Sequence, residues 1–168
     1  MKIELKNIKI NLTFSEETTM FMADVYVNGK KTAYANNDGR GGCTFYNSYH
    51  APNNDEDLRQ AEAFCKALPP IRSEEFDFEY DMNLEHFIDN LIEDELKKKE
   101  QKKLEKKMLD TIMWGKPNGY SYTQVKFKVP LAKVPTARLQ EIVDKYKKEF
   151  KSGDEFLNTN LEALGIKL

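Results

Sequence analysis

The chain has 168 residues, of which 40% are apolar and 32% charged, and its formal net charge at pH 7 is −2. This length and apolar content predict a single domain, residues 1–168, and the small net charge gives no global attraction to nucleic acid or to an anionic membrane. No apolar run approaches the ~20 residues that span a bilayer, and the first six residues do not resemble a signal peptide. We therefore expect a cytoplasmic protein without a membrane partner.

Residues 1–50 are predicted to be mostly β-strand. Apolar and polar residues alternate there, but the parity changes at Lys6-Asn7, which indicates a bulge or two short strands. Asn28-Gly29 supplies the two positive-φ residues of a type I′ hairpin turn. Together these signals predict an antiparallel meander of four or five strands.

Helices alternate with strands in the rest of the chain. Asn53 or Asn54 can cap a helix, and Asn83 can cap the longest one. Glu74–Asp81, in which aromatic and acidic residues alternate, reads as a strand. The predicted fold class is α+β, an antiparallel β-sheet meander with helices packed on one side and a long, charged helix. Its expected later elements are a helix at 54–68, the long helix at 83–113, a strand at 120–129 and a helix at 135–150.

The long helix contains a dense run of lysines. Between Lys97 and Lys107 there are seven lysines and two glutamates, and the turns before them are acidic. This order complements the helix dipole and allows favourable i,i+4 pairs, so a self-stabilised helix bridging solvent explains the run. A basic surface that contacts nucleic acid or an acidic partner is the alternative.

A glycine-rich loop between two predicted strands is the first candidate site. Three glycines in four positions allow positive φ and close approach of a ligand, and consecutive N–H groups can bind an anion. Arg40 adds a planar, permanently charged group suited to phosphate. The alternative is a wide hairpin loop whose glycines serve only the turn. The predicted ligand-binding residues here are Asn37, Asp38, Gly39, Arg40, Gly41 and Gly42.

The second candidate site lies between Trp114 and Tyr122. It combines the only tryptophan, a lysine, two tyrosines and a turn. Aromatic side chains stack on nucleobases, and hydroxyl groups recognise polar edges. The alternative is a loop held on the core by its tryptophan. The predicted ligand-binding residues are Trp114, Lys116, Tyr120 and Tyr122.

Other reactive side chains are sparse. His50 follows the glycine-rich loop by one short strand and is included as a candidate ligand-binding residue, whereas His86 is expected at the surface. Cys43 and Cys65 do not form a metal-ligand pattern, and Cys65 is expected to be buried and reduced. Asp77, Glu79 and Asp81 can form a solvated face, a cation site or a phosphate-like surface. We assign no catalytic residue, metal or cofactor.

The glycine-rich loop, Asn37 to Gly42, the lysine-rich helix and the segment Gly115 to Tyr122 together resemble small uncharacterised proteins encoded by bacteriophages. The resemblance implies no known catalytic residues. It implies a class of roles, since small phage proteins often antagonise host defence. Some sequester cyclic or ADP-ribose-type nucleotide signals, and others block a host protein directly.

These observations predict a non-catalytic protein that binds a small phosphorylated, nucleotide-like ligand. Gly39 to Gly42 would hold the phosphate, and the tyrosines and Trp114 would cover the base or ribose. We also expect a homo-oligomer that assembles through the long helix. The alternatives are an inhibitor that binds a host protein through its charged helix or acidic strand and, less favoured, a nucleotide-processing enzyme.

Overall fold

The computed structural model describes residues 1–72, 78–117, 119 and 121–168. Contacts divide the chain into two compact units, Met1–Leu96 and Lys97–Leu168, and the helix α2 (Leu84–Met108) contains the boundary between them. The sequence predicts a single domain, whereas each unit has its own hydrophobic core. Composition fixes how many apolar residues are available to be buried, but it does not determine whether they form one core or two.

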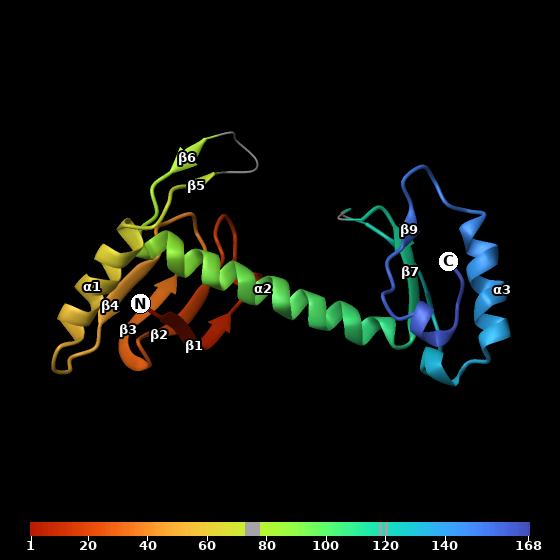
Figure 1. Ribbon diagram of the computed structural model, residues 1–168, viewed down its shortest axis with the longest axis horizontal. Helices are drawn as coiled ribbons and strands as arrows, with labels where there is room; N and C mark the ends of the chain where they lie inside the picture. Colours follow the sequence, from red (N-terminus) through yellow and green to blue (C-terminus); the bar gives the residue numbers. More distant parts are fainter. Residues whose placement is uncertain (73–77, 118, 120) are drawn as a thin grey trace. The chain divides into compact units, whose positions relative to one another are not determined.

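A four-stranded antiparallel sheet with the strand order β1-β2-β3-β4 forms the body of the first unit (Figure 1). The predicted meander is thus confirmed. Its bulge is confirmed too, because the β1–β2 register shifts between Lys6 and Lys9, where Asn7 has a φ of +53°. Asn28 and Gly29 both have positive φ, as the predicted turn requires. The elements are β1 (Ile3–Ile10), the 3₁₀ helix η1 (Leu12–Phe14), β2 (Phe21–Val27), β3 (Lys30–Asn37) and β4 (Phe45–Ser48).

The helix α1 (Asn54–Lys66) and the first half of α2 cover one face of this sheet, which confirms the predicted α+β arrangement. Cys65 is fully buried, as predicted, and burial raises the pKa of its thiol to about 11. The opposite face of the sheet exposes Met22, Tyr34 and Phe45. The core between sheet and helices includes Phe21, Ala23, Val25, Ala33, Ala35, Ala61, Cys65, Leu84, Ile88 and Ile92.

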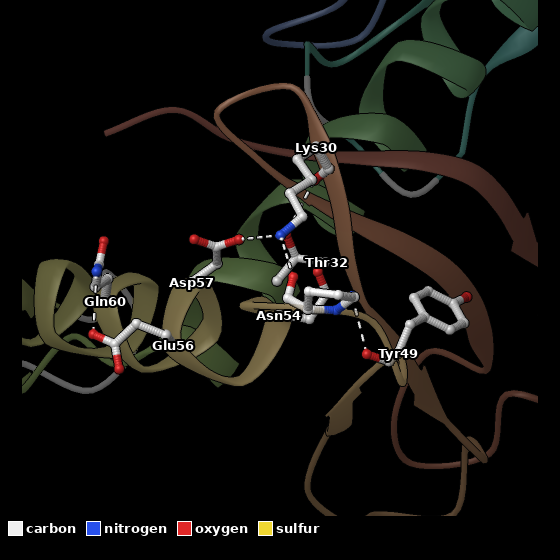
Figure 2. Close-up of polar contacts among 8 residues, drawn as sticks. Lys30, Thr32, Tyr49, Asn54, Glu56, Asp57 and Gln60 are labelled. Atoms are coloured by element: carbon white, nitrogen blue, oxygen red, sulfur yellow. Dashed lines mark hydrogen bonds and ion pairs between the residues drawn. The ribbon is translucent and has the colours of Figure 1, made fainter.

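Polar contacts fix the start of α1 to the sheet (Figure 2). Lys30 Nζ donates to the carbonyl of Pro52 at 3.0 Å and forms an ion pair with Asp57 at 2.7 Å. Asn54 is buried, and its Nδ2 donates to the carbonyl of Tyr49 at 3.0 Å. Asn53 occupies the N-cap position with a φ of +66°, but its side chain makes no capping hydrogen bond to any described residue. The start of this helix is therefore held by tertiary contacts rather than by the predicted side-chain cap.

The connection from α1 to α2 contains a short antiparallel pair, β5 (Ile71–Arg72) and β6 (Glu79–Tyr80). Of the predicted acidic strand, residues 74–77 lie outside the described part of the chain. At the start of α2, Asn83 Oδ1 accepts from the N–H of His86 at 2.8 Å, which confirms the predicted cap. Residues 97–103 of α2 are all exposed, as predicted for a helix middle in solvent.

The second unit contains a three-stranded antiparallel sheet with the order β8-β7-β9. The central strand β7 (Thr111–Gly115) is buried at all five positions and pairs with β8 (Thr123–Lys126) and β9 (Glu155–Phe156). The helix α3 (Thr136–Lys147) contributes Leu139 and Val143 to a core with Ile112, Trp114, Leu131, Leu161 and Ile166. Two 3₁₀ helices complete the unit, η2 (Leu131–Lys133) and η3 (Glu162–Leu164).

The prediction of a long helix at 83–113 is wrong at the C-terminal end. The helix ends at Met108, and Ile112, which continues the i, i+4, i+8 series of Leu104 and Met108, lies on β7. A short buried strand and the buried side of a helix contain similar residues, so apolar spacing over a few positions cannot separate them. The strand predicted at 120–129 is confined to Thr123–Lys126, and the helices predicted at 54–68 and 135–150 are each shorter at one or both ends. None of the described helices is long and apolar enough to cross a bilayer.

The contrast along α2 predicts unequal effects of substitution. Ile92 is 2% exposed and lies in the first core, whereas Lys102 is exposed. We expect Ile92→Ala to lower the free energy of unfolding by about 2–5 kcal/mol and Lys102→Ala to change it by about 0–1 kcal/mol. Urea unfolding followed by circular dichroism measures both, and equal small losses would contradict this packing of α2.

Candidate functional site

The glycine-rich loop is organised by the buried side chain of Asn37. Its Oδ1 accepts from the N–H of Gly39 at 2.8 Å and from Thr18 Oγ1 at 2.7 Å. Its Nδ2 donates to the carbonyl of Gly42 at 3.0 Å and to Thr44 Oγ1 at 3.3 Å. An asparagine amide has two donor hydrogens and two acceptor lone pairs, so all four are used within the protein. Asn37, predicted as a ligand-binding residue, thus holds the loop together.

Three backbone N–H groups of the loop are also engaged, those of Gly39, Arg40 and Gly41. Besides Gly39, the N–H of Arg40 donates to Asp38 Oδ1 at 3.2 Å, and the N–H of Gly41 donates to Thr18 Oγ1 at 3.2 Å. The carbonyl of Gly39 accepts from the N–H groups of residues 16, 17 and 18. An anion cradle needs unpaired N–H groups, and these three already have acceptors. The loop geometry therefore matches the alternative interpretation, in which the glycines serve a turn.

A carboxylate of the protein itself lies against the loop. A Cβ built on Gly41 would come within 2.2 Å of Glu17 Oε2, so Glu17 occupies the space that a side chain at position 41 would need. The guanidinium of Arg40 is exposed and lines a hollow of about 430 Å³ with Phe14, Glu16 and Asp38. The exposed side chain of Arg40 therefore remains able to bind an anion.

A larger hollow beside the loop is acidic. It has a volume of about 500 Å³, and Phe21, Ile92 and Leu96 form its apolar part. Asp89 lines it and accepts from Thr44 Oγ1 at 2.5 Å, and desolvation by burial raises the pKa of the Asp89 carboxyl. Its other carboxylates are Glu16, Glu17 and Glu93. This surface is suited to a cation and unsuited to a phosphate.

Trp114 belongs to the core of the second unit. It is 4% exposed and stacks on Tyr146 with 4.6 Å between ring centroids, and it makes a T-shaped pair with Phe156 with 6.4 Å between ring centroids. These neighbours cover the indole ring, which matches the alternative that the tryptophan holds the loop on the core. Lys116 and Tyr122 are exposed, and Tyr120 lies outside the described residues.

Described residues between Trp114 and Tyr122 nevertheless border a third hollow, which lies in the second unit and has a volume of about 590 Å³. Lys116 and Lys151 are in its wall, together with the hydroxyl-bearing Ser121 and Thr123. Tyr122, which is 41% exposed, accepts a hydrogen bond from Lys107 Nζ at 2.7 Å, and this ammonium also lies 4.8 Å from the ring centroid. We call this the lysine–tyrosine hollow, and its lining is completed by Trp114, Gly115, Gly119, Glu149 and Asp154.

Neither histidine lines any of the three hollows described above. His50 is exposed. His86 makes an edge contact with Tyr80 at 4.8 Å, and its Nδ1 lies 3.1 Å from the carbonyl of Asp81. Across residues 1–72, 78–117, 119 and 121–168, no group of three or more His, Cys, Asp and Glu side chains is arranged to hold a metal ion. Asp77 of the predicted acidic face is outside these residues.

One polar cluster was not predicted. On the exposed face of the first sheet, Asp24 accepts hydrogen bonds from Tyr49 Oη and from Asn7 Nδ2, and it pairs with Lys31 at 2.9 Å. The hydrogen bond from Tyr49, followed by those from Asn7 and Lys31, lowers the pKa of the Asp24 carboxyl to about 2. These residues come from four segments of the chain. Their adjacency follows from the register of the strands. The bulge predicted at Lys6-Asn7 was the one sequence signal that bore on this register.

The structure thus places the predicted residues in different units: Asn37–Gly42 and His50 in the first, and Trp114, Lys116 and Tyr122 in the second. Comparisons of the chain with protein-family models, with curated proteins and with solved structures find no match.

Two glycines with almost the same φ test the structural role of the loop. A Cβ on Gly39 (φ +84°) would lie 2.5 Å from the carbonyl oxygen of Phe14, whereas one on Gly29 (φ +85°) would meet no atom within 4 Å. Gly29→Ala should cost about 1–2 kcal/mol for its left-handed conformation, and Gly39→Ala about 1–3 kcal/mol more because of overpacking. Chemical denaturation of both variants checks this, and equal losses would show that the loop is not packed against Phe14.

The Asp24 cluster predicts a pH dependence of stability. The pKa of Asp24 is depressed in the folded state, to about 2 from 3.8, so its stabilising contribution is present above pH 4 and is lost as the pH falls towards 2. Asp24→Asn should therefore lower the free energy of unfolding at pH 7 and make little difference at pH 2. Urea unfolding at the two pH values measures this, and an equal loss at both would contradict the assignment.

Proposed function

We propose that the protein binds a small phosphorylated, nucleotide-like ligand without altering it chemically, and that the lysine–tyrosine hollow is the binding site. Its volume of about 590 Å³ lies within the range of about 300–1,000 Å³ that is usual for small-molecule sites. The observation that carries the proposal is the composition of its lining, in which two lysines, an exposed tyrosine, a serine and a threonine border one cavity.

The chemistry of this hollow supports a ligand with an anionic and a planar part. Lys116 and Lys151 can neutralise phosphate charge, and Tyr122 offers a ring face of the kind on which bases stack. Glu149 and Asp154 equal the two lysines in formal charge, and Lys107, whose Nζ donates to Tyr122, adds one positive charge beside the hollow. Asp154 Oδ2 also accepts from the N–H of Lys151 at 2.9 Å. Glu149 can accept from ribose hydroxyl groups.

The glycine-rich loop supports the same ligand less well. Three of its N–H groups have intramolecular acceptors, and the hollow beside it is lined by four carboxylates. Coulomb repulsion disfavours a phosphate there. Arg40 remains the second possible anchor, and the experiment below separates the two positions.

The biological role proposed for such binding rests on the sequence resemblance to small phage proteins. In that role the protein sequesters a nucleotide signal of host defence. Sequestration needs affinity and no reacting group, and no catalytic residue is assigned in this proposal.

A ligand panel tests the proposal directly. Thermal shift against mononucleotides, ADP-ribose and cyclic dinucleotides should identify a stabilising ligand, because a molecule that binds only the folded state raises the melting temperature. In calorimetry with that ligand, Lys116→Ala combined with Lys151→Ala should weaken binding at least tenfold, since each removes a charge-assisted contact worth about 1.5–3 kcal/mol.

Matched variants make the result specific to the hollow. Lys133→Ala, an exposed lysine of the same unit outside the hollow, should leave affinity unchanged. A loss of binding in Arg40→Ala but not in the lysine variant would move the site to the glycine-rich loop. A panel without any stabilising ligand would contradict small-ligand binding and favour the alternative, an inhibitor that binds a host protein.

A further inference from the structure

The two units carry opposite charges, which the net charge of −2 conceals. Residues 1–96 include nine Lys and Arg against 19 Asp and Glu, a net charge of −10. Residues 97–168 include 17 Lys and Arg against nine Asp and Glu, a net charge of +8. The balance of the whole chain therefore does not describe the field around either unit, and each one attracts partners of opposite sign.

The most concentrated positive surface is on α2. Lys98, Lys99, Lys102, Lys103 and Lys106 are all exposed, and we call them the basic stripe. At 100° per residue they occupy an arc of about 140° over a length of about 12 Å. Lys98–Lys102, Lys99–Lys103 and Lys102–Lys106 are like-charge i,i+4 neighbours, which weaken a helix. Asp94 and Glu95 stand four residues before Lys98 and Lys99, but each of Lys102, Lys103 and Lys106 has a lysine four residues before it. The C-terminal part of the stripe therefore gains no helix-stabilising pair in this direction and is suited to an anionic partner.

The complementary surface is the acidic hollow of the first unit. Its carboxylates belong to Glu16, Glu17, Asp89 and Glu93, and the described residues that line it include no Lys or Arg. Its floor is apolar, with Phe21 and Ile92 almost fully buried. A lysine side chain has an apolar stem and a charged head, so it matches both the floor and the carboxylates of a hollow of about 500 Å³.

We propose that the basic stripe of one copy docks on the acidic hollow of a second copy of this chain. Both surfaces are present on every molecule at equal concentration, and their charges are complementary. A nucleic acid fits less well, because the stripe is joined through α2 to a unit that carries −10. When each copy both supplies a stripe and receives one, the contacts close into a dimer with the same interface on both sides.

Ionic strength and charge exchange test this self-association, which is independent of the proposed small-ligand function. In sedimentation velocity at 50 mM NaCl the full chain should dimerise, and at 500 mM NaCl the dimer dissociation constant should rise at least tenfold because the charges are screened. Lys98→Glu with Lys102→Glu, and separately Glu16→Lys with Glu93→Lys, should each weaken the dimer at least tenfold. An equimolar mixture of these two variants should restore it, since both contacts again join opposite charges.

Two controls exclude a general effect of net charge and a loss of the fold. Lys128→Glu with Lys133→Glu makes the same change in net charge outside the stripe and should leave the dimer intact. Circular dichroism should show that every variant keeps the fold of the parent. Three results would overturn the proposal. The chain could remain a monomer at 50 mM NaCl, or the mixture of the two variants could fail to reassociate. A monomeric chain could also slow a DNA or RNA duplex in a gel-shift experiment in a way that depends on the stripe lysines.

Discussion

Each unit of this protein depends on one buried asparagine amide that takes the place of backbone pairing. In the first unit Asn37, 7% exposed, makes four hydrogen bonds that join the glycine-rich loop to Thr18 and Thr44. In the second unit Asn158, 5% exposed, accepts from the N–H of Met113 at 2.6 Å and donates to the carbonyl of Thr111 at 2.8 Å. A buried amide left unpaired is costly, so these networks fix the segments they join to one arrangement.

The first network holds the glycine-rich loop in place. Thr44, which Asn37 contacts, donates from its N–H to Glu85 and from its hydroxyl to Asp89, so the loop is tied to α2 through one residue. The same contacts shape the acidic hollow, because Asn37, Gly42 and Asp89 all line it. The carboxylates of this hollow come from residues 16, 17, 89 and 93, and the glycine-rich loop contributes only Asn37 and Gly42 to its wall.

Charge is distributed over the chain by unit rather than evenly. The helix α2 carries both signs, with Asp89 and Glu93 in the acidic hollow and the basic stripe beyond residue 97. The second unit combines its positive charge with the lysine–tyrosine hollow, where Tyr122 is held by Lys107. The net positive charge of residues 97–168 attracts anions, and the lysine–tyrosine hollow and the basic stripe are two separate lysine-containing surfaces of this unit.

The sequence by itself determined those features that depend on neighbouring residues. The turn at Asn28-Gly29, the bulge at Asn7, the cap at Asn83 and the exposed lysines of α2 follow from local dihedral preferences and from side-chain periodicity. Tertiary structure decided what depends on contacts between distant segments. Ile112 is a strand residue because β7 pairs there with β8, at Val125. The N–H of Gly41 is occupied because Thr18, 23 residues earlier in the chain, accepts from it, whereas the N–H groups of Gly39 and Arg40 donate to side chains only two residues away. Composition can indicate that a loop is able to bind an anion, but only the surrounding chain shows whether its donors are still available.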